Sequence, residues 1–329
     1  MLTASDLVSL PYTPDLTRAG ITYACRSLAH TYDRMGGSPI DRLRRIVSGK
    51  AVELAFRRHL TTYGIPHDNL GATPFTDPDK YDVSLGGRRV DIKSFQIFGK
   101  KLISSIHKDP ACLLDAAALV PADQLNTNHQ SDNDLYIFTF LTALITPQYE
   151  DLQKAAFAGQ PLYLIHPLPT PWALPSNWQP LQRLRLKSES GNQVLTLELG
   201  GQIADHSFAT ERLFLPSGKV SASKTGFHAL AYLNISHLPE GRIGIRTASL
   251  EAHVIQPKEW GNIWIYGLHI YLAGYITRGE FRRRASYLPA GSQVFQYPHT
   301  RTPNYSLPIR DLYPLAELFK NVKAWWAGK

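Results

Sequence analysis

The sequence predicts an α/β fold in which a mixed sheet, flanked by helices, is followed by a second, β-rich domain. Three observations lead to this prediction. The pair Gly86-Gly87 separates two runs that alternate apolar and polar residues, residues 135–141 are almost all apolar, and residues 166–180 contain five prolines. The first pattern predicts a β-hairpin, the second a strand buried on both faces, and the third a boundary between domains.

The remaining elements follow in chain order. Helical spacing of apolar residues predicts helices at 16–32 and 40–63, the second ending at Gly64. Further helices are expected at 111–120 and 147–158, with strands at 135–141 and 162–165 between and after them. From residue 181 onwards the pattern indicates mostly strands, including 263–276, and a terminal helix at 315–326. We therefore expect one domain at 1–168 and a strand-rich domain at 181–329.

Composition restricts the class of protein. A chain of 329 residues that is 43% hydrophobic and 19% charged is expected to fold into more than one compact core. Its net charge of +8 favours a polyanionic partner, although charge alone does not separate DNA from RNA or an acidic membrane. Cys25 and Cys112 are too far apart for a zinc site or an iron–sulfur cluster. No secretory signal or bilayer-spanning run is evident, so a cytoplasmic protein is expected.

The predicted hairpin contains two of the candidate site residues, Asp82 and Asp91. With Gly86 and Gly87 at the turn, Val83 pairs with Val90 and Asp82 with Asp91. Opposed carboxylates destabilise a hairpin unless a cation compensates them, and Mg²⁺ is commonly held by one or two carboxylates. Lys93 shares the face of Asp91. The alternative is that these residues lie on a solvated strand face.

A third acid, Glu53, lies on the predicted helix at 40–63. It precedes Phe56 by three residues and Leu60 by seven, which places it at the edge of the face that packs on the core. A carboxylate in that position needs a partner. Arg57, four residues later, is the ordinary helical partner, and the hairpin acids are the functional alternative.

A helical glutamate, then Asp82, then Asp91-Ile92-Lys93 on a hairpin, resembles the PD-(D/E)XK (restriction-endonuclease-like) nuclease superfamily over roughly residues 40–165. The resemblance implies a Mg²⁺ site formed by Asp82, Asp91 and the main-chain carbonyl of Ile92, with Mn²⁺ able to substitute. It also implies that Lys93 orients or activates the attacking water and that Glu53 supports the metal. Tyr81 stands where the family pattern has proline.

Basic residues predict where nucleic acid is contacted. The densest group lies near Tyr287, and arginine suits phosphates and guanine edges. A solvated helix face is the alternative. The residues expected to contact nucleic acid are Arg278, Arg282, Arg283, Arg284 and Arg301.

The function expected from these features is a Mg²⁺-dependent endonuclease that hydrolyses phosphodiester bonds in double-stranded DNA, of restriction or defence type. A homodimer is expected by analogy with enzymes that cut both strands. Two alternatives stay open: a nuclease directed to RNA or to a nucleic-acid structure, and a non-catalytic binding module in which the acids are a relic.

Overall fold

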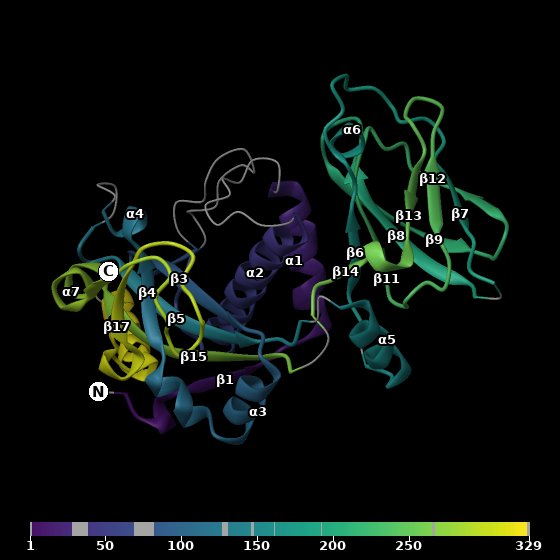
Figure 1. The fold of residues 1–329 in the computed structure, drawn as a ribbon. Helices are drawn as coiled ribbons and strands as arrows, with labels where there is room; N and C mark the ends of the chain where they lie inside the picture. Colours follow the sequence, from purple (N-terminus) through teal and green to yellow (C-terminus); the bar gives the residue numbers. More distant parts are fainter. Residues whose placement is uncertain are drawn as a thin grey trace.

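The computed structural model describes residues 2–27, 39–68, 82–126, 131–145, 148–160, 162–191, 193–264 and 267–327. Its elements form two bodies (Figure 1), one built on a mixed sheet with helices and one built on two antiparallel sheets. The predicted α/β class, with a mixed sheet, helices and a strand-rich second unit, is confirmed at this level.

Sheet A is the mixed sheet of the first body, and its five strands lie in the order β1-β15-β5-β3-β2. Only β3 and β5 run parallel among these neighbours. The strands are β1 (Val8–Pro11), β2 (Val83–Leu85), β3 (Arg88–Ile97), β5 (Leu135–Thr142) and β15 (His269–Thr277).

Strand β5 is buried on both faces, as its apolar sequence predicts, because each face of sheet A is covered. Leu135 and Ile137 pack into a core with three helices, α1 (Pro14–Ser27), α2 (Pro39–Thr62) and α8 (Leu315–Ala327). Tyr136 and Phe138 pack into a second core on the opposite face. The helices that contribute to that core are α3 (Lys100–Lys108), α4 (Ala122–Leu125), α7 (Arg278–Arg284), η2 (Pro110–Asp115) and η4 (Ile309–Asp311). Sheet B also contributes, and it consists of β4 (Ala117–Pro121), β16 (Ser286–Leu288) and β17 (Asn304–Pro308). The short helix η1 (Ala4–Asp6) lies near η2 and buries none of its own residues.

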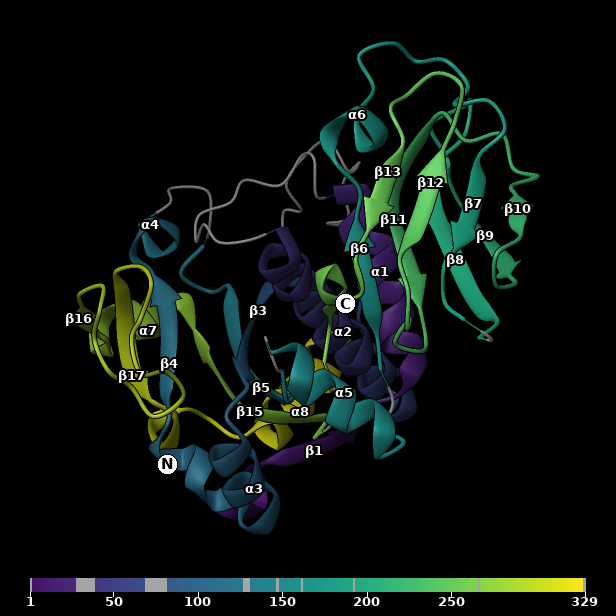
Figure 2. The same ribbon diagram turned by 45° about the vertical axis from the view of Figure 1, so that its right-hand side comes forward.

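The second body, called here the β unit (residues 164–262), holds sheets C and D around a leucine-rich core. Sheet C contains β14 (Gly261–Asn262), β6 (Leu164–Pro167), β11 (Ala229–Ile235), β8 (Leu195–Gln202) and β9 (Phe208–Leu215), in that order. Sheet D contains β10 (Val220–Ala222), β7 (Arg185–Ser188), β12 (Ile243–Arg246) and β13 (His253–Ile255), in that order. The short helices α5 (Tyr149–Phe157), α6 (Thr170–Ala173) and η3 (Pro257–Glu259) accompany these strands. Figure 2 shows α1 and α2 beside this unit, and Ile165 and Tyr232 contribute to the core that contains both helices.

The order of the strands in the sheets differs from the predicted division of the chain into one domain at 1–168 and another at 181–329. Strand β15 lies in sheet A between β1 and β5, and α8 packs on the same sheet, so the β unit is an insertion in the chain. A strand's sequence indicates its burial but not its pairing partner, which is why reading the chain in order assigned 263–276 to the second domain. The helix predicted at 111–120 is helical only as η2, and its second half forms strand β4.

None of the helices among the described residues has the length and hydrophobicity needed to cross a bilayer.

Candidate functional site

The hairpin forms with the predicted register. Val83 pairs with Val90 and Leu85 with Arg88, and the turn glycines Gly86 and Gly87 have φ values of +58° and +84°. Positive φ at both central positions is the geometry of a type I′ turn. A Cβ atom on Gly86 would also lie 2.7 Å from the Trp325 ring of α8, so a glycine is needed there for both conformation and space.

Asp82 departs from the predicted pairing with Asp91. The ladder between β2 and β3 ends at Val83 and Val90. Beyond it, the Asp82 amide donates to the carbonyl of Val90 (3.0 Å), and its carboxylate Oδ2 accepts the amide N–H of Ile92 (2.7 Å). The N–H and C=O groups of one strand residue point to the same side, so the carbonyl of Ile92 lies on the edge of β3 that Asp82 occupies.

Asp91 and Lys93 share one face of β3, as predicted. The Lys93 Nζ donates to Asp91 Oδ2 (2.6 Å) and to Gln124 Oε1 of α4 (2.7 Å). It also lies 5.4 Å from the centroid of the Tyr136 ring. The lysine side chain is 10% exposed, whereas that of Asp91 is 30% exposed, so the acid is the more accessible partner.

Glu53 is buried on α2 between two cations. Lys50 Nζ lies 2.8 Å from Glu53 Oε2, and Arg57 forms the expected helical ion pair with Oε1. Arg57 also donates to the main-chain carbonyl of Asp82. The ordinary helical partner is therefore present, and Arg57 also links the helical glutamate to the backbone at the end of the hairpin.

The charges of the predicted site residues affect the pKa of Asp82. Burial, together with the neighbouring charges of Asp91 and Glu53, raises the pKa of Asp82 to about 7, although the Ile92 amide and Lys93 act in the opposite direction. Neighbouring acids that cannot all be ionised without strong repulsion are typical of sites that bind a cation or a proton. Asp82 is thus the acid on which the other three predicted residues act.

The available donors fit a hard cation with few protein ligands. Asp82, Asp91 and the Ile92 carbonyl offer oxygen atoms, which Mg²⁺ prefers, and Mg²⁺ usually keeps waters or phosphate oxygens in its other positions. Lys93 and the pair Lys50 and Arg57 already neutralise Asp91 and Glu53. Within the described ranges, no group of three or more His, Cys, Asp or Glu side chains is arranged to hold a metal ion.

The sequence did not indicate Gln124 or Tyr136 as members of the site. Gln124 lies 31 residues after Lys93 on the four-residue helix α4, where no motif marks it. Tyr136 lies opposite Asp91 in the parallel ladder, and burial, with Asp91 nearby, raises its pKa to about 12. Only the pairing of β3 with β5 brings this ring to the site.

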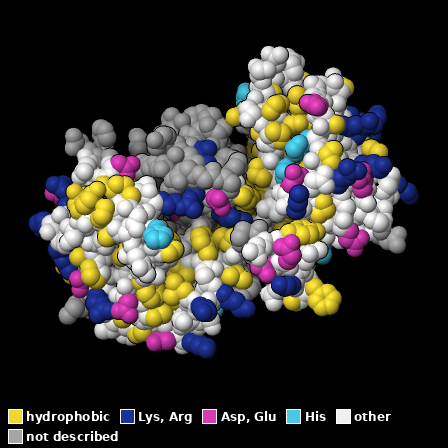
Figure 3. Space-filling model, in the orientation of Figure 1, with side chains coloured by type: hydrophobic (Ala, Val, Ile, Leu, Met, Phe, Trp, Pro, Cys, Tyr) yellow, Lys and Arg dark blue, Asp and Glu magenta, His cyan; other side chains and the backbone are white. Residues whose placement is uncertain are grey.

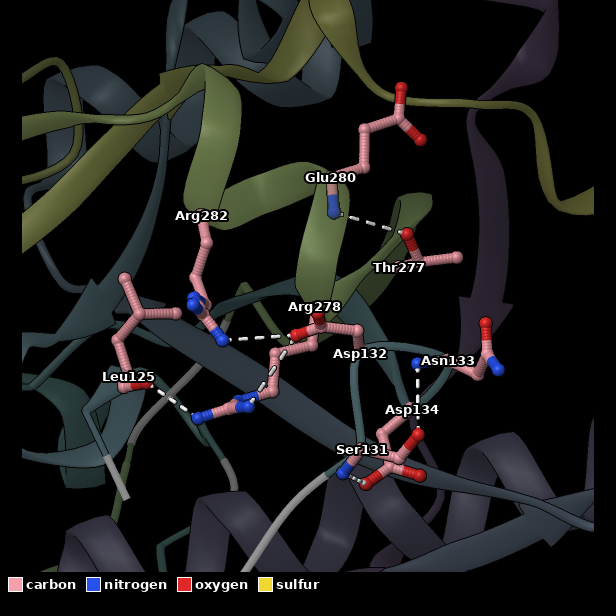
Figure 4. Close-up of polar contacts among 9 residues, drawn as sticks. All are labelled: Leu125, Ser131, Asp132, Asn133, Asp134, Thr277, Arg278, Glu280 and Arg282. Carbon is pink, nitrogen blue, oxygen red and sulfur yellow. Dashed lines mark hydrogen bonds and ion pairs between the residues drawn. The ribbon is translucent and has the colours of Figure 1, made fainter. Parts of the chain in front are cut away.

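The five arginines predicted to contact nucleic acid do not form one exposed cluster. Arg278 is 3% exposed and donates to the carbonyl of Leu125 (2.6 Å), and Arg282 donates to Asp132 (3.0 Å), as Figure 4 shows. Arg284 pairs with Glu280 (3.2 Å). All of these arginines except Arg278 are exposed. Arg278 therefore holds α4 to α7 inside the fold.

The chain matches no protein-family model, no curated protein and no solved structure. The nuclease resemblance stays a prediction, carried by the residues and contacts described above.

Proposed function

We propose that this protein is a Mg²⁺-dependent nuclease that hydrolyses phosphodiester bonds in DNA. The observation that carries the proposal is a set of contacts among residues from three separate parts of the chain: Asp82 accepts the Ile92 amide next to Asp91, Lys93 donates to Asp91, and Arg57 contacts both Glu53 and the carbonyl of Asp82. Four of these residues, Glu53, Asp82, Asp91 and Lys93, form the superfamily pattern in the sequence. A solvated strand face would give no reason for a buried helical acid and a hairpin acid to influence each other.

In this proposal, Asp82, Asp91 and the carbonyl of Ile92 hold the cation, and Glu53 supports it from α2. Bound Mg²⁺ would supply Lewis-acid stabilisation of charge on the phosphoryl oxygens. Lys93 has three N–H donors, and Asp91 and Gln124 use two of them. The third is available to orient the attacking water or to stabilise negative charge on the phosphate.

A basic face on sheet D supports nucleic acid as the substrate. Arg185 and Lys187 point outward from β7, and Arg246 of β12 lies directly opposite Arg185. We call these three residues the basic face; Figure 3 shows Lys and Arg side chains gathered over β7 and β12. None of the outward ladder positions of sheet D that the structure describes is acidic, since the others are Val220, Ala222, Gly244 and Val254. Opposed cations destabilise a sheet, and a polyanion would compensate them.

The first test is cleavage by the wild-type protein. We expect nicking or cutting of plasmid DNA in Mg²⁺ or Mn²⁺ and none in EDTA, measured by gel electrophoresis. Single- and double-stranded RNA of matched length are assayed in parallel. Binding without cleavage of any of these substrates in either metal would instead support the non-catalytic module, and cleavage of RNA alone would replace the DNA assignment.

The basic face gives a second test. Removing it with Arg185→Ala, Lys187→Ala and Arg246→Ala should weaken DNA binding in EDTA and reduce the slope of log K against log salt by about 2 to 3. The matched control replaces Lys100, Lys101 and Lys108 of α3 by alanine, which removes the same charge from exposed positions. Equal losses in the two triple variants would mean that net charge, and not this face, determines binding.

A further inference from the structure

Two histidines from sheets C and D lie against each other in the β unit. His166 lies on β6 and His253 on β13, which belong to different sheets. Their Nε2 atoms are 3.0 Å apart, and the ring planes are inclined by 30°. The two residues are separated by 87 positions in the sequence, so no local spacing marks them as a pair.

The surroundings define the protonation of His166. Its Nδ1 atom lies 3.3 Å from the main-chain carbonyl of Glu259 in η3. A carbonyl only accepts, so Nδ1 carries the proton and Nε2 presents a lone pair toward His253. Burial lowers the pKa of both imidazoles, which favours their neutral forms near pH 7. Without a metal, His253 Nε2–H then donates to His166 Nε2, and metal binding would move the His253 proton to its Nδ1 atom.

We infer that His166 and His253 form a binding site for a divalent transition metal ion of the Zn²⁺ class. Zinc–nitrogen bonds of about 2.0 to 2.1 Å in a tetrahedral site place two ligand nitrogens about 3.3 Å apart. The two Nε2 atoms are 3.0 Å apart, so the rings need to move apart only slightly for both to bind the ion. The hydrogen bond from His166 Nδ1 to a carbonyl is the outer interaction that orients metal-ligating histidines.

The protein supplies two ligands to this site, and water fills the other positions. Both histidines are only partly buried. The negative charge of Glu259 partly opposes the effect of burial on the pKa of His253, and it favours a cation there. Nitrogen donors select a different metal class from the oxygen donors around Asp82, so this site is separate from the proposed Mg²⁺ site.

A metal ion at this position would join the two sheets. His166 belongs to a strand paired with β11 and β14, and His253 to the edge strand of sheet D. Bridging them links the sheets of the β unit on one side of the leucine core. Binding to the folded state alone raises the apparent stability of that unit.

The test is a titration of the full-length, tag-free protein with zinc chloride by isothermal calorimetry. We expect one equivalent of Zn²⁺ to bind, with affinity reduced at least about tenfold in His166→Asn and in His253→Asn. His237→Asn, at an exposed position on the same unit, should bind like the wild type. Zinc should raise the melting temperature of the wild type and of His237→Asn, and it should not raise that of His166→Asn or His253→Asn.

Electron paramagnetic resonance with Cu²⁺ on the wild-type protein gives a readout that does not depend on any variant folding. Hyperfine coupling to two imidazole nitrogens is the expected spectrum. Failure of the wild type to bind zinc at millimolar concentration, or a Cu²⁺ spectrum without nitrogen coupling, would overturn the inference. Because Asp91→Ala leaves both histidines intact, unchanged zinc binding in that variant separates this site from the proposed nuclease site.

Discussion

Asp91→Ala and Lys93→Ala are each expected to reduce metal-dependent cleavage by at least about a hundredfold, the loss typical when a group that stabilises developing charge is removed. Asp91 would supply a cation ligand, and Lys93 the remaining donor toward the phosphate. Both residues lie outside the apolar core, so circular dichroism and thermal melting should report a folded protein. Initial rates of plasmid nicking in Mg²⁺ provide the measurement.

A second acid–lysine pair in the chain offers a matched control. Asp151 and Lys154 lie 3.5 Å apart on α5, and their side chains are 47% and 79% exposed. Asp151→Ala and Lys154→Ala make the same chemical changes and should cleave like the wild type. Full activity in both Asp91→Ala and Lys93→Ala would dismiss the nuclease assignment.

Asp82→Asn is expected to stabilise the metal-free protein at high pH. Because the folded-state pKa of Asp82 is raised from 3.8 to about 7, the wild type loses stability relative to the variant as pH rises through that interval. The full shift corresponds to about 4 kcal/mol, and partial solvent exposure reduces the expected gain to about 2 kcal/mol at pH 8. Asparagine keeps an oxygen acceptor for the Ile92 amide.

Urea unfolding at pH 4, 6 and 8, in EDTA and in Mg²⁺, measures this effect. Magnesium should stabilise the wild type at pH 8 and have much less effect on Asp82→Asn, since the variant lacks the charge. Asp205→Asn is the control of opposite sign, because the Ser207 side chain lowers the pKa of that exposed acid. An Asp82→Asn variant that is no more stable than the wild type at pH 8, with the same response to Mg²⁺, would contradict the proposed cation site.

Local patterns explain which parts of the site the sequence could predict. The register of the hairpin follows from Gly86-Gly87 and the alternation around it, so Val83 and Val90 pair as expected. The position of Lys93 beside Asp91 follows from the two-residue period of a strand. Asp82 does not pair across the strands with Asp91; its carboxylate accepts a hydrogen bond from the Ile92 amide instead. This arrangement depends on where the three-residue strand β2 ends, and no residue type in the sequence indicates it.

Non-local contacts account for what the sequence did not predict. Gln124 reaches Lys93 only because α4 follows a strand of sheet B that lies across the face of sheet A. Nothing in the sequence indicates that Arg282 of α7 pairs with Asp132, which lies in a turn about 150 residues earlier. The basic face likewise depends on the pairing of β7 with β12, which brings together cations that are 61 residues apart, from 185 to 246.

The place of β15 in sheet A affects how the protein is made. The ribosome releases the strand carrying Asp91 and Lys93 early, but β5 beside it has an open edge until residues 269–277 emerge and pair with it. The whole β unit is translated in that interval. A nascent chain therefore carries all four acidic and basic residues of the proposed nuclease site long before the sheet beneath them is complete.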